Sequence, residues 1–185
     1  MEFILSDDRQ DLVGESVDVA LRIGVLNDST AVARKIGMVH RVVVATPAYL
    51  ARAGTPSVPG DLADHAIIVG PAGRVMEGWT FRRDGKASSV RVEGRFILNS
   101  MEAAAAAAIA GLGILSTGDL SVMSELETGQ LVRVLPDWKM GSANINVVLP
   151  AGRAAKPSAR AFSDFMEAEF RAVLTARSRG ERIAS

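Results

Sequence analysis

The chain has 185 residues, 48% of them hydrophobic, and its 21 Lys and Arg residues equal its 21 Asp and Glu residues in number. This length suffices for one sizeable core or two small lobes, and the balanced charge, without a basic stripe, argues against direct binding to DNA or to an anionic membrane. The absence of cysteine excludes disulfides, thiolate catalysis and cysteine-ligated metal, and it fits a reducing cytoplasm.

Neither the N-terminal residues nor the longest apolar run indicates export or membrane insertion. The N-terminal residues turn acidic at Asp7 and Asp8 and lack the positive region of a signal peptide. The longest uncharged apolar run, Ala103–Leu115, is shorter than the roughly 20 residues that a membrane span needs. We therefore expect a soluble, cytoplasmic protein that does not bind membranes.

The first part of the chain alternates strands with short helices. VDVALRI (17–23) has apolar residues at every second position, which predicts a strand with one better-buried face. RVVVAT (41–46) is a β-branched strand that ends at Pro47. The other predicted elements here are strands 2–5, 33–40 and 66–69 and helical segments 8–15, 47–54 and 61–65. Such alternation favours βαβ units in an α/β protein.

The remainder adds a hairpin, further strands and a terminal helix. Trp79–Lys86 and Ser88–Glu93 flank Asp84-Gly85, a strong turn signal. The strands 41–46 and 144–150 are similar, and we expect them to cross between two lobes. The other predicted elements are strands 95–98, 131–135 and 144–149, helices 119–127 and 158–176, and a frayed tail at 177–185.

One stretch combines helix and strand signals, NSMEAAAAAAIAGLGILSTG at 99–118. Asn99 and Glu102 match a capping box, so we expect a helix to begin there. The six alanines that follow have high helix propensity and permit close packing, and Gly111 predicts the helix end. The apolar run 112–115 is predicted to be a buried strand.

The same stretch predicts a ligand site. Ser116 and Thr117 end the predicted strand with hydroxyl groups, one element after the helix N-terminus. In an α/β sheet, a helix N-terminus and a strand end can border one crevice, where anions and small polar ligands bind.

Enzymatic chemistry has little support. His40 and His65 lack metal-ligand spacing, the GxSxG and HExxH motifs are absent, and Gly111-Leu112-Gly113 lacks the third glycine and the lysine of phosphate-binding loops. We therefore nominate no catalytic residue, no metal ligand and no cofactor.

Asp11–Pro56 closely resembles the effector-binding domain of LysR-type transcriptional regulators, and the resemblance covers nearly the whole chain. It continues through GDLADHAIIVG, WTFRRDG, NSMEAAAAAAIAGLGIL, LETGQLVRVLPDW and KPSARAFSDFMEAEF. The resemblance implies an α/β, two-lobed periplasmic-binding-protein-like (type 2) fold, with Rossmann-like lobes joined by two crossing strands. Lobe I would comprise 1–46 and 144–176, lobe II 47–143, and 177–185 a flexible tail.

The resemblance also implies a function and partners. The domain would bind a small-molecule effector between its lobes, and regulators of this family act as dimers or tetramers. They bind DNA through an N-terminal winged helix-turn-helix. We expect that this chain lacks that domain, together with the first strand and helix of the effector domain, so that it would reach DNA only through the missing part.

By position, the resemblance implies that the cleft is lined by Gly24, Val25, Leu26, Thr46, Gly70, Pro71, Asn99, Ser100, Met101, Ser116 and Thr117. The N–H groups of Ser100 and Met101 lie in the first helical turn, where a carboxylate is favoured, so we expect a carboxylate effector.

Several alternatives stay open. Asn99 could serve mainly as a cap, with the ligand touching the neighbouring N–H groups. Ser116 and Thr117 could form a solvated strand end instead of contacting ligand. Arg22 and Arg41 could clamp an anion or reach a surface carboxylate. The alternative function is a stand-alone solute-binding protein of the same fold, which would require a signal peptide.

Overall fold

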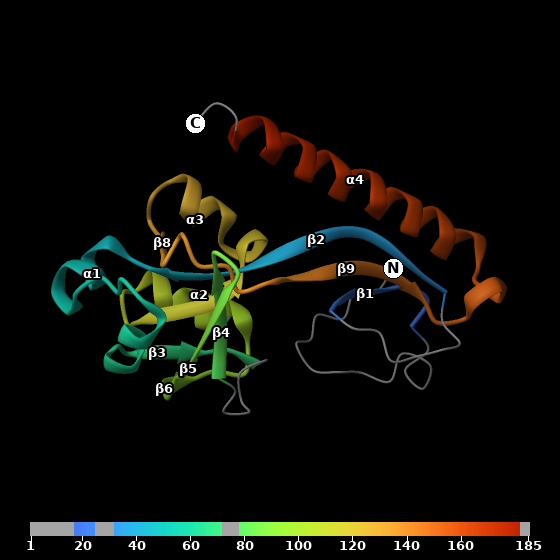
Figure 1. Ribbon diagram of the computed structural model, residues 1–185. Helices are drawn as coiled ribbons and strands as arrows, with labels where there is room; N and C mark the ends of the chain where they lie inside the picture. Colours follow the sequence, from blue (N-terminus) through green and yellow to red (C-terminus); the bar gives the residue numbers. More distant parts are fainter. Residues whose placement is uncertain (1–16, 25–31, 72–77, 182–185) are drawn as a thin grey trace. The chain divides into compact units, whose positions relative to one another are not determined.

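The computed structural model describes residues 17–24, 32–71 and 78–181 (Figure 1). These residues form two compact units. We call His40–Ser142 the inner unit, and 17–39 with 143–181 the outer unit. The predicted lobe limits remain a prediction. The predicted strand 2–5, the helical segment 8–15 and the site residues Val25 and Leu26 lie outside the described residues.

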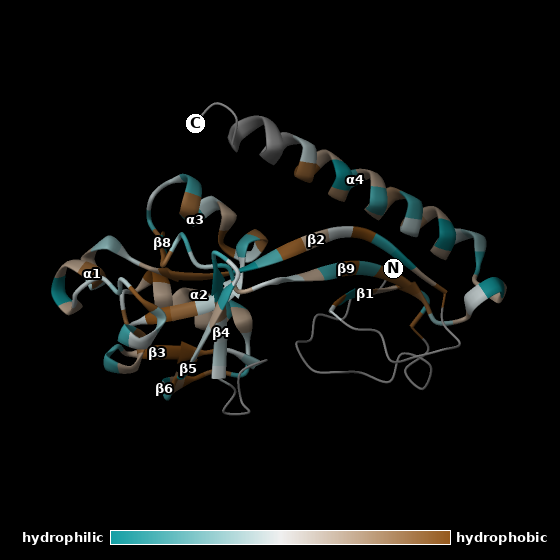
Figure 2. Cartoon of the chain, viewed as in Figure 1, coloured by the Kyte–Doolittle hydropathy of each residue, from teal (hydrophilic) through white to brown (hydrophobic). Residues whose placement is uncertain are grey.

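The outer unit is a small antiparallel sheet with one long helix. Strand β1 (Ala20–Ile23) pairs with β9 (Ser142–Leu149), and the Gly24 N–H donates to the Asn144 carbonyl at 2.9 Å. Helix α4 (Pro157–Glu181) extends past its predicted end at residue 176 into the segment assigned to the tail. Its alternating hydropathy in Figure 2 marks it as amphipathic.

Ion pairs and close apolar packing hold α4 to the first part of β2. Arg34 Nη1 lies 2.7 Å from both Asp164 Oδ1 and Glu167 Oε2. These two hydrogen bonds raise the pKa of Arg34 above its ordinary value. A Cβ at Gly37 would lie 3.1 Å from Leu174 Cδ1, so the missing side chain permits close packing of helix on strand.

Strand β2 (Val32–Ala45) is continuous where the sequence predicted two strands, 33–40 and 41–46. The two predicted runs are contiguous, and both suit an extended backbone. The Asp119 carboxylate accepts a hydrogen bond from the His40 N–H at 3.0 Å, at the point where one run meets the next. The chain thus passes from the outer unit into the inner unit within one strand.

The sheet of the inner unit is mixed. The end of β2 pairs antiparallel with β7 (Ile114–Gly118) and with β8 (Val132–Val134). Strand β7 pairs in parallel with β3 (Ile67–Val69), which pairs in parallel with β6 (Gly94–Ile97). Strands β6 and β7 are joined through helix α2 and form a βαβ unit. The βαβ units predicted for the first part of the chain are wrong for β2, α1 and β3, because β2 is antiparallel to β7 and therefore also to β3. The carboxyl ends of β3, β6 and β7 therefore meet at one edge.

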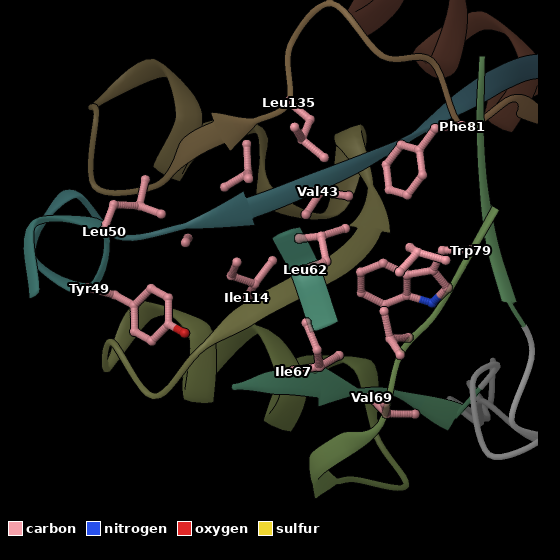
Figure 3. Packing of buried hydrophobic residues seen from close by; sticks show 14 residues of the cluster. Val43, Tyr49, Leu50, Leu62, Ile67, Val69, Trp79, Phe81, Ile114 and Leu135 are labelled. Atoms are coloured by element: carbon pink, nitrogen blue, oxygen red, sulfur yellow. The ribbon is translucent and has the colours of Figure 1, made fainter. Parts of the chain in front are cut away.

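Side chains cover both faces of this sheet. On one face, Trp79 and Phe81 pack against Val43 and Ile114 in the cluster that Figure 3 shows. On the other face, the buried side chains of α2 belong to a second cluster. That cluster consists of Val42, Val44, Ile68, Ala104, Ala108, Leu115, Val122 and Leu131. Strand β3, buried on both faces, is strongly hydrophobic in Figure 2.

The predicted hairpin and its turn are confirmed. Strands β4 (Gly78–Arg83) and β5 (Lys86–Arg91) pair antiparallel around Asp84-Gly85. Asp84 and Gly85 have φ values of 51° and 75°. Positive φ at both central residues gives a two-residue turn whose twist matches that of the strands.

Helix α2 (Met101–Ile109) begins one residue later than predicted. Its N-cap is Ser100, whose Oγ accepts from the Ala103 N–H at 3.3 Å, so the prediction of Asn99 as the cap is wrong. Ser100 has the extended backbone of an N-cap residue, and serine caps as well as asparagine does. The predicted end at Gly111 is confirmed by its φ of 73°.

Short helices complete the inner unit. Helix α1 (Pro47–Ala53), capped by Thr46, confirms the predicted segment 47–54. The others are η1 (Pro59–Asp64), η3 (Asp119–Val122), α3 (Met123–Glu127) and, in the outer unit, η4 (Gly152–Ala154). No helix in the described part of the chain is long and apolar enough to cross a bilayer.

We expect Asp61 to make stability depend on pH. One oxygen of its carboxylate accepts from Ser57 N, Ser57 Oγ and Val58 N at 2.8–3.0 Å. These bonds, first that of the Ser57 amide, lower the pKa of Asp61. The unfolded chain therefore binds the proton more tightly, and the stabilisation is present above the ordinary aspartate pKa and lost as pH falls through the folded value.

The measurement is the melting temperature against pH for wild type and Asp61→Asn. We expect Asp61→Asn to melt lower at neutral pH, and the two curves to converge in acid. Asp64→Asn, at an exposed aspartate of the same turn, is the control and should follow wild type. A difference between Asp61→Asn and wild type that persists unchanged into acid would contradict this prediction.

Candidate functional site

The candidate site lies at the carboxyl edge of the parallel strands in the inner unit. Gly70 follows β3, Asn99 and Ser100 follow β6, and Ser116 lies in the middle of β7. In open α/β sheets this edge is where ligands bind, because helix N-termini and loops converge there.

A small pocket opens at this edge. It is lined by Arg41, Ile68, Val69, Gly70, Trp79, Met101 and Ser116. Its volume of about 20 Å³ holds about one water molecule. The structure thus brings together three of the predicted site residues, Gly70, Met101 and Ser116, in a recess large enough for one small group of a ligand.

Arg41 is the charged residue of this lining. Its Nε donates to Ser116 Oγ at 2.8 Å. Ser116 Oγ in turn lies 3.7 Å from the Met140 sulfur, to which it can donate its single proton. Ser116 is 7% exposed. The serine hydroxyl therefore connects the guanidinium to a thioether and fixes the direction of Arg41.

Ser116 and Thr117 face opposite sides of the sheet. Both lie within β7, where successive side chains alternate between faces. Thr117 Oγ1 lies 3.4 Å from Met101 Sδ, and Thr117 is 3% exposed. The alternative of a solvated strand end is therefore wrong for both residues, and Ser116 alone of the two lines the pocket.

Met101 forms a wall of the pocket from the first turn of α2. It packs directly over Gly70: a Cβ built at position 70 would lie 2.8 Å from Met101 Cε. A methyl group there would force the end of the methionine to move. Gly70 is thus small because Met101 occupies the space beside it.

The other predicted site residues have different surroundings. Thr46 Oγ1 accepts from the Tyr49 N–H at 3.1 Å and caps α1. Asn99 is exposed and Pro71 half-buried, and neither lines the pocket. Gly24 ends β1 in the outer unit.

Ile68, Val69 and Trp79 also line the pocket and were not predicted from the sequence. Trp79 and Phe81 alternate along the hairpin strand, which was the available signal that one of its faces packs on the sheet. Among the described residues, no group of three or more His, Cys, Asp or Glu side chains is placed to hold a metal ion.

Comparison with known proteins identifies the family. The LysR substrate binding domain matches residues 2–171. The chain belongs to this family. PtxR, an HTH-type transcriptional regulator from Pseudomonas aeruginosa, is 35% identical to the chain over 164 residues, which are 88% of the chain and 52% of PtxR. The chain spans about half the length of the curated relatives it matches.

Solved LysR-type regulators have the same α/β, periplasmic-binding-protein-like (type 2) fold. The full-length virulence activator AphB of Vibrio cholerae superposes with a TM-score of 0.78 at 29% identity, covering 91% of this chain and 57% of AphB. The regulatory domain of CrgA from Neisseria meningitidis gives a TM-score of 0.75 at 28% identity, covering 85% of this chain and 78% of that domain.

Proposed function

We propose that this LysR substrate-binding domain senses a small carboxylate, bound at the carboxyl edge of the inner sheet. The observation that carries the proposal is Arg41, the charged residue among the seven described residues that line the pocket there. A guanidinium binds a carboxylate through paired hydrogen bonds, and Ser116 holds this one at 2.8 Å.

The position of helix α2 also favours a negatively charged ligand. Its N-terminus, at Met101, borders the pocket, and the first turn of a helix carries partial positive charge. The capping bond uses the Ala103 N–H. It does not change the direction of the helix dipole, whose positive end is at the pocket. Glu102 of the same turn is exposed, so water screens its repulsion of an anion.

The relatives support a role in transcription, since PtxR is an HTH-type transcriptional regulator. In our proposal the chain acts in the cytoplasm as part of a homo-oligomeric regulator, a dimer or tetramer, that contacts DNA through a helix-turn-helix domain. The effector would bind one arrangement of the regulator better than another and so shift the equilibrium between them. The chain itself would catalyse no reaction.

A thermal-shift comparison of matched acids and amides tests the proposal. The probes are acetate, butanoate, hexanoate and benzoate, each paired with its uncharged primary amide. We expect at least one acid to raise the melting temperature of the 185-residue chain, because a ligand that binds the native state stabilises it. Its amide should not, since it lacks the charge that Arg41 recognises.

Arg41→Gln should weaken binding of that acid by about 10- to 100-fold, the usual worth of a hydrogen bond to a charged group. Arg91→Gln, at an exposed arginine of β5 outside the pocket, is the matched control and should bind as wild type does. Equal stabilisation by acid and amide, or unchanged binding to Arg41→Gln, would contradict a carboxylate site at Arg41. Stabilisation by none of these acids would likewise count against it.

A further inference from the structure

We infer that Met101 sets the size of the ligand group that the pocket accepts, and that this group is a compact apolar part of a carboxylate ligand. This inference rests on the proposed function and names the part of the ligand that Arg41 does not recognise. Apart from Arg41 and Ser116, the pocket lining consists of Ile68, Val69, Gly70, Trp79 and Met101. Apart from the guanidinium and the hydroxyl, the described residues of the lining therefore offer no polar side chain to a ligand.

Met101 is held in place from two sides. Its sulfur lies 3.4 Å from Thr117 Oγ1, which approaches from β7. Its terminal methyl group lies 2.8 Å, and its sulfur 3.4 Å, from the position that a Cβ at Gly70 would take. A methionine has several rotatable bonds and adapts to irregular spaces. The threonine hydroxyl and the bare backbone of Gly70 restrict that freedom and give this wall a defined position.

This arrangement permits the pocket to be changed in size from either side. Removing the Met101 side chain enlarges it. Adding a methyl group at Gly70 displaces the end of Met101 and alters the pocket without removing a side chain. Gly70 does not have positive φ, so alanine suits its backbone. The next atom near the added Cβ is Ala104 Cβ at 3.7 Å, an ordinary contact.

The test measures Kd for acetate, butanoate, hexanoate and octanoate with the 185-residue chain and its variants. We expect Met101→Ala to favour the longer acids over acetate, relative to wild type, by about tenfold for each methylene accommodated. Gly70→Ala should favour acetate over hexanoate by a similar factor. The double variant should behave like Met101→Ala, because without the methionine the new methyl group at position 70 has nothing to displace.

Two controls separate size selection from loss of structure. Met101→Leu, which keeps the side-chain volume nearly constant, should keep the wild-type preference. Met38→Ala removes an exposed methionine of the outer unit and should change nothing. If Met101→Ala does not fold, Gly70→Ala and Met101→Leu still decide the matter.

An unchanged chain-length preference in Met101→Ala and Gly70→Ala, with acids still bound through Arg41, would overturn the inference and leave the proposed function standing. Failure of the wild-type chain to bind any of the four acids would overturn the proposed function, and the inference with it.

Discussion

Phe81→Ala is expected to lower the free energy of unfolding by about 4 kcal/mol. Phe81 lies on β4 with no exposed surface, in the cluster shown in Figure 3. Truncation removes buried apolar area and leaves a cavity that the surrounding side chains cannot fully collapse into. For a chain of this size, such a loss corresponds to a fall in melting temperature of about 12 °C.

Phe165→Ala provides the same chemical change at an exposed position of α4, where Phe165 is 56% exposed. We expect it to cost less than about 1 kcal/mol, since most of its area already contacts water. Phe81→Leu should fall between the two. Urea denaturation followed by circular dichroism measures all three variants. Similar losses for Phe81→Ala and Phe165→Ala would contradict the placement of Phe81 in the core.

The second large effect is expected at Gly113, immediately before β7. A Cβ at Gly113 would overlap the carbonyl oxygen of Ala66. That oxygen accepts the hydrogen bond from the Ile114 N–H at 2.8 Å. Because the contact is with backbone, no side chain can rotate away, and strands β3 and β7 must separate locally. We expect Gly113→Ala to destabilise by about 3 kcal/mol.

Gly60→Ala is the matched control, because no atom lies within 4 Å of its added Cβ and its φ is not positive. We expect it to change the free energy of unfolding by less than about 0.5 kcal/mol. Both variants can be measured in the same urea titrations. Unfolding of Gly113→Ala at the same urea concentration as Gly60→Ala would contradict the close packing of Gly113 against the Ala66 carbonyl.

Elements with local signals were predicted well from the sequence. The turn at Asp84-Gly85 needs only residues that tolerate positive φ, and the end of α2 needs only Gly111. The exact cap of α2 was not predictable, because Asn99 and Ser100 are adjacent and both cap helices well. The hydrogen bond from the Ala103 N–H to Ser100 Oγ, which the structure shows, identifies Ser100 as the cap.

The site depends on contacts that no local pattern contains. The sequence placed Ser116 and Thr117 at the end of a strand, whereas both are buried within β7 and point to opposite faces. Extending the strand to Gly118 would have predicted this separation from the two-residue period alone. Arg41 was recognised as an anion-binding candidate, but its bond to Ser116 joins residues 75 positions apart.

Within the part of the chain that the structure describes, the inner unit is one uninterrupted stretch, whereas the outer unit is assembled from two distant stretches. The ion pair of Arg34 with Asp164, for example, joins residues 130 positions apart. Loops of such length close slowly, because their entropy must be lost before the contact forms. During synthesis, the inner unit can therefore fold as soon as residue 142 has left the ribosome. The first strands of the outer unit can complete their packing only after α4 has been synthesised.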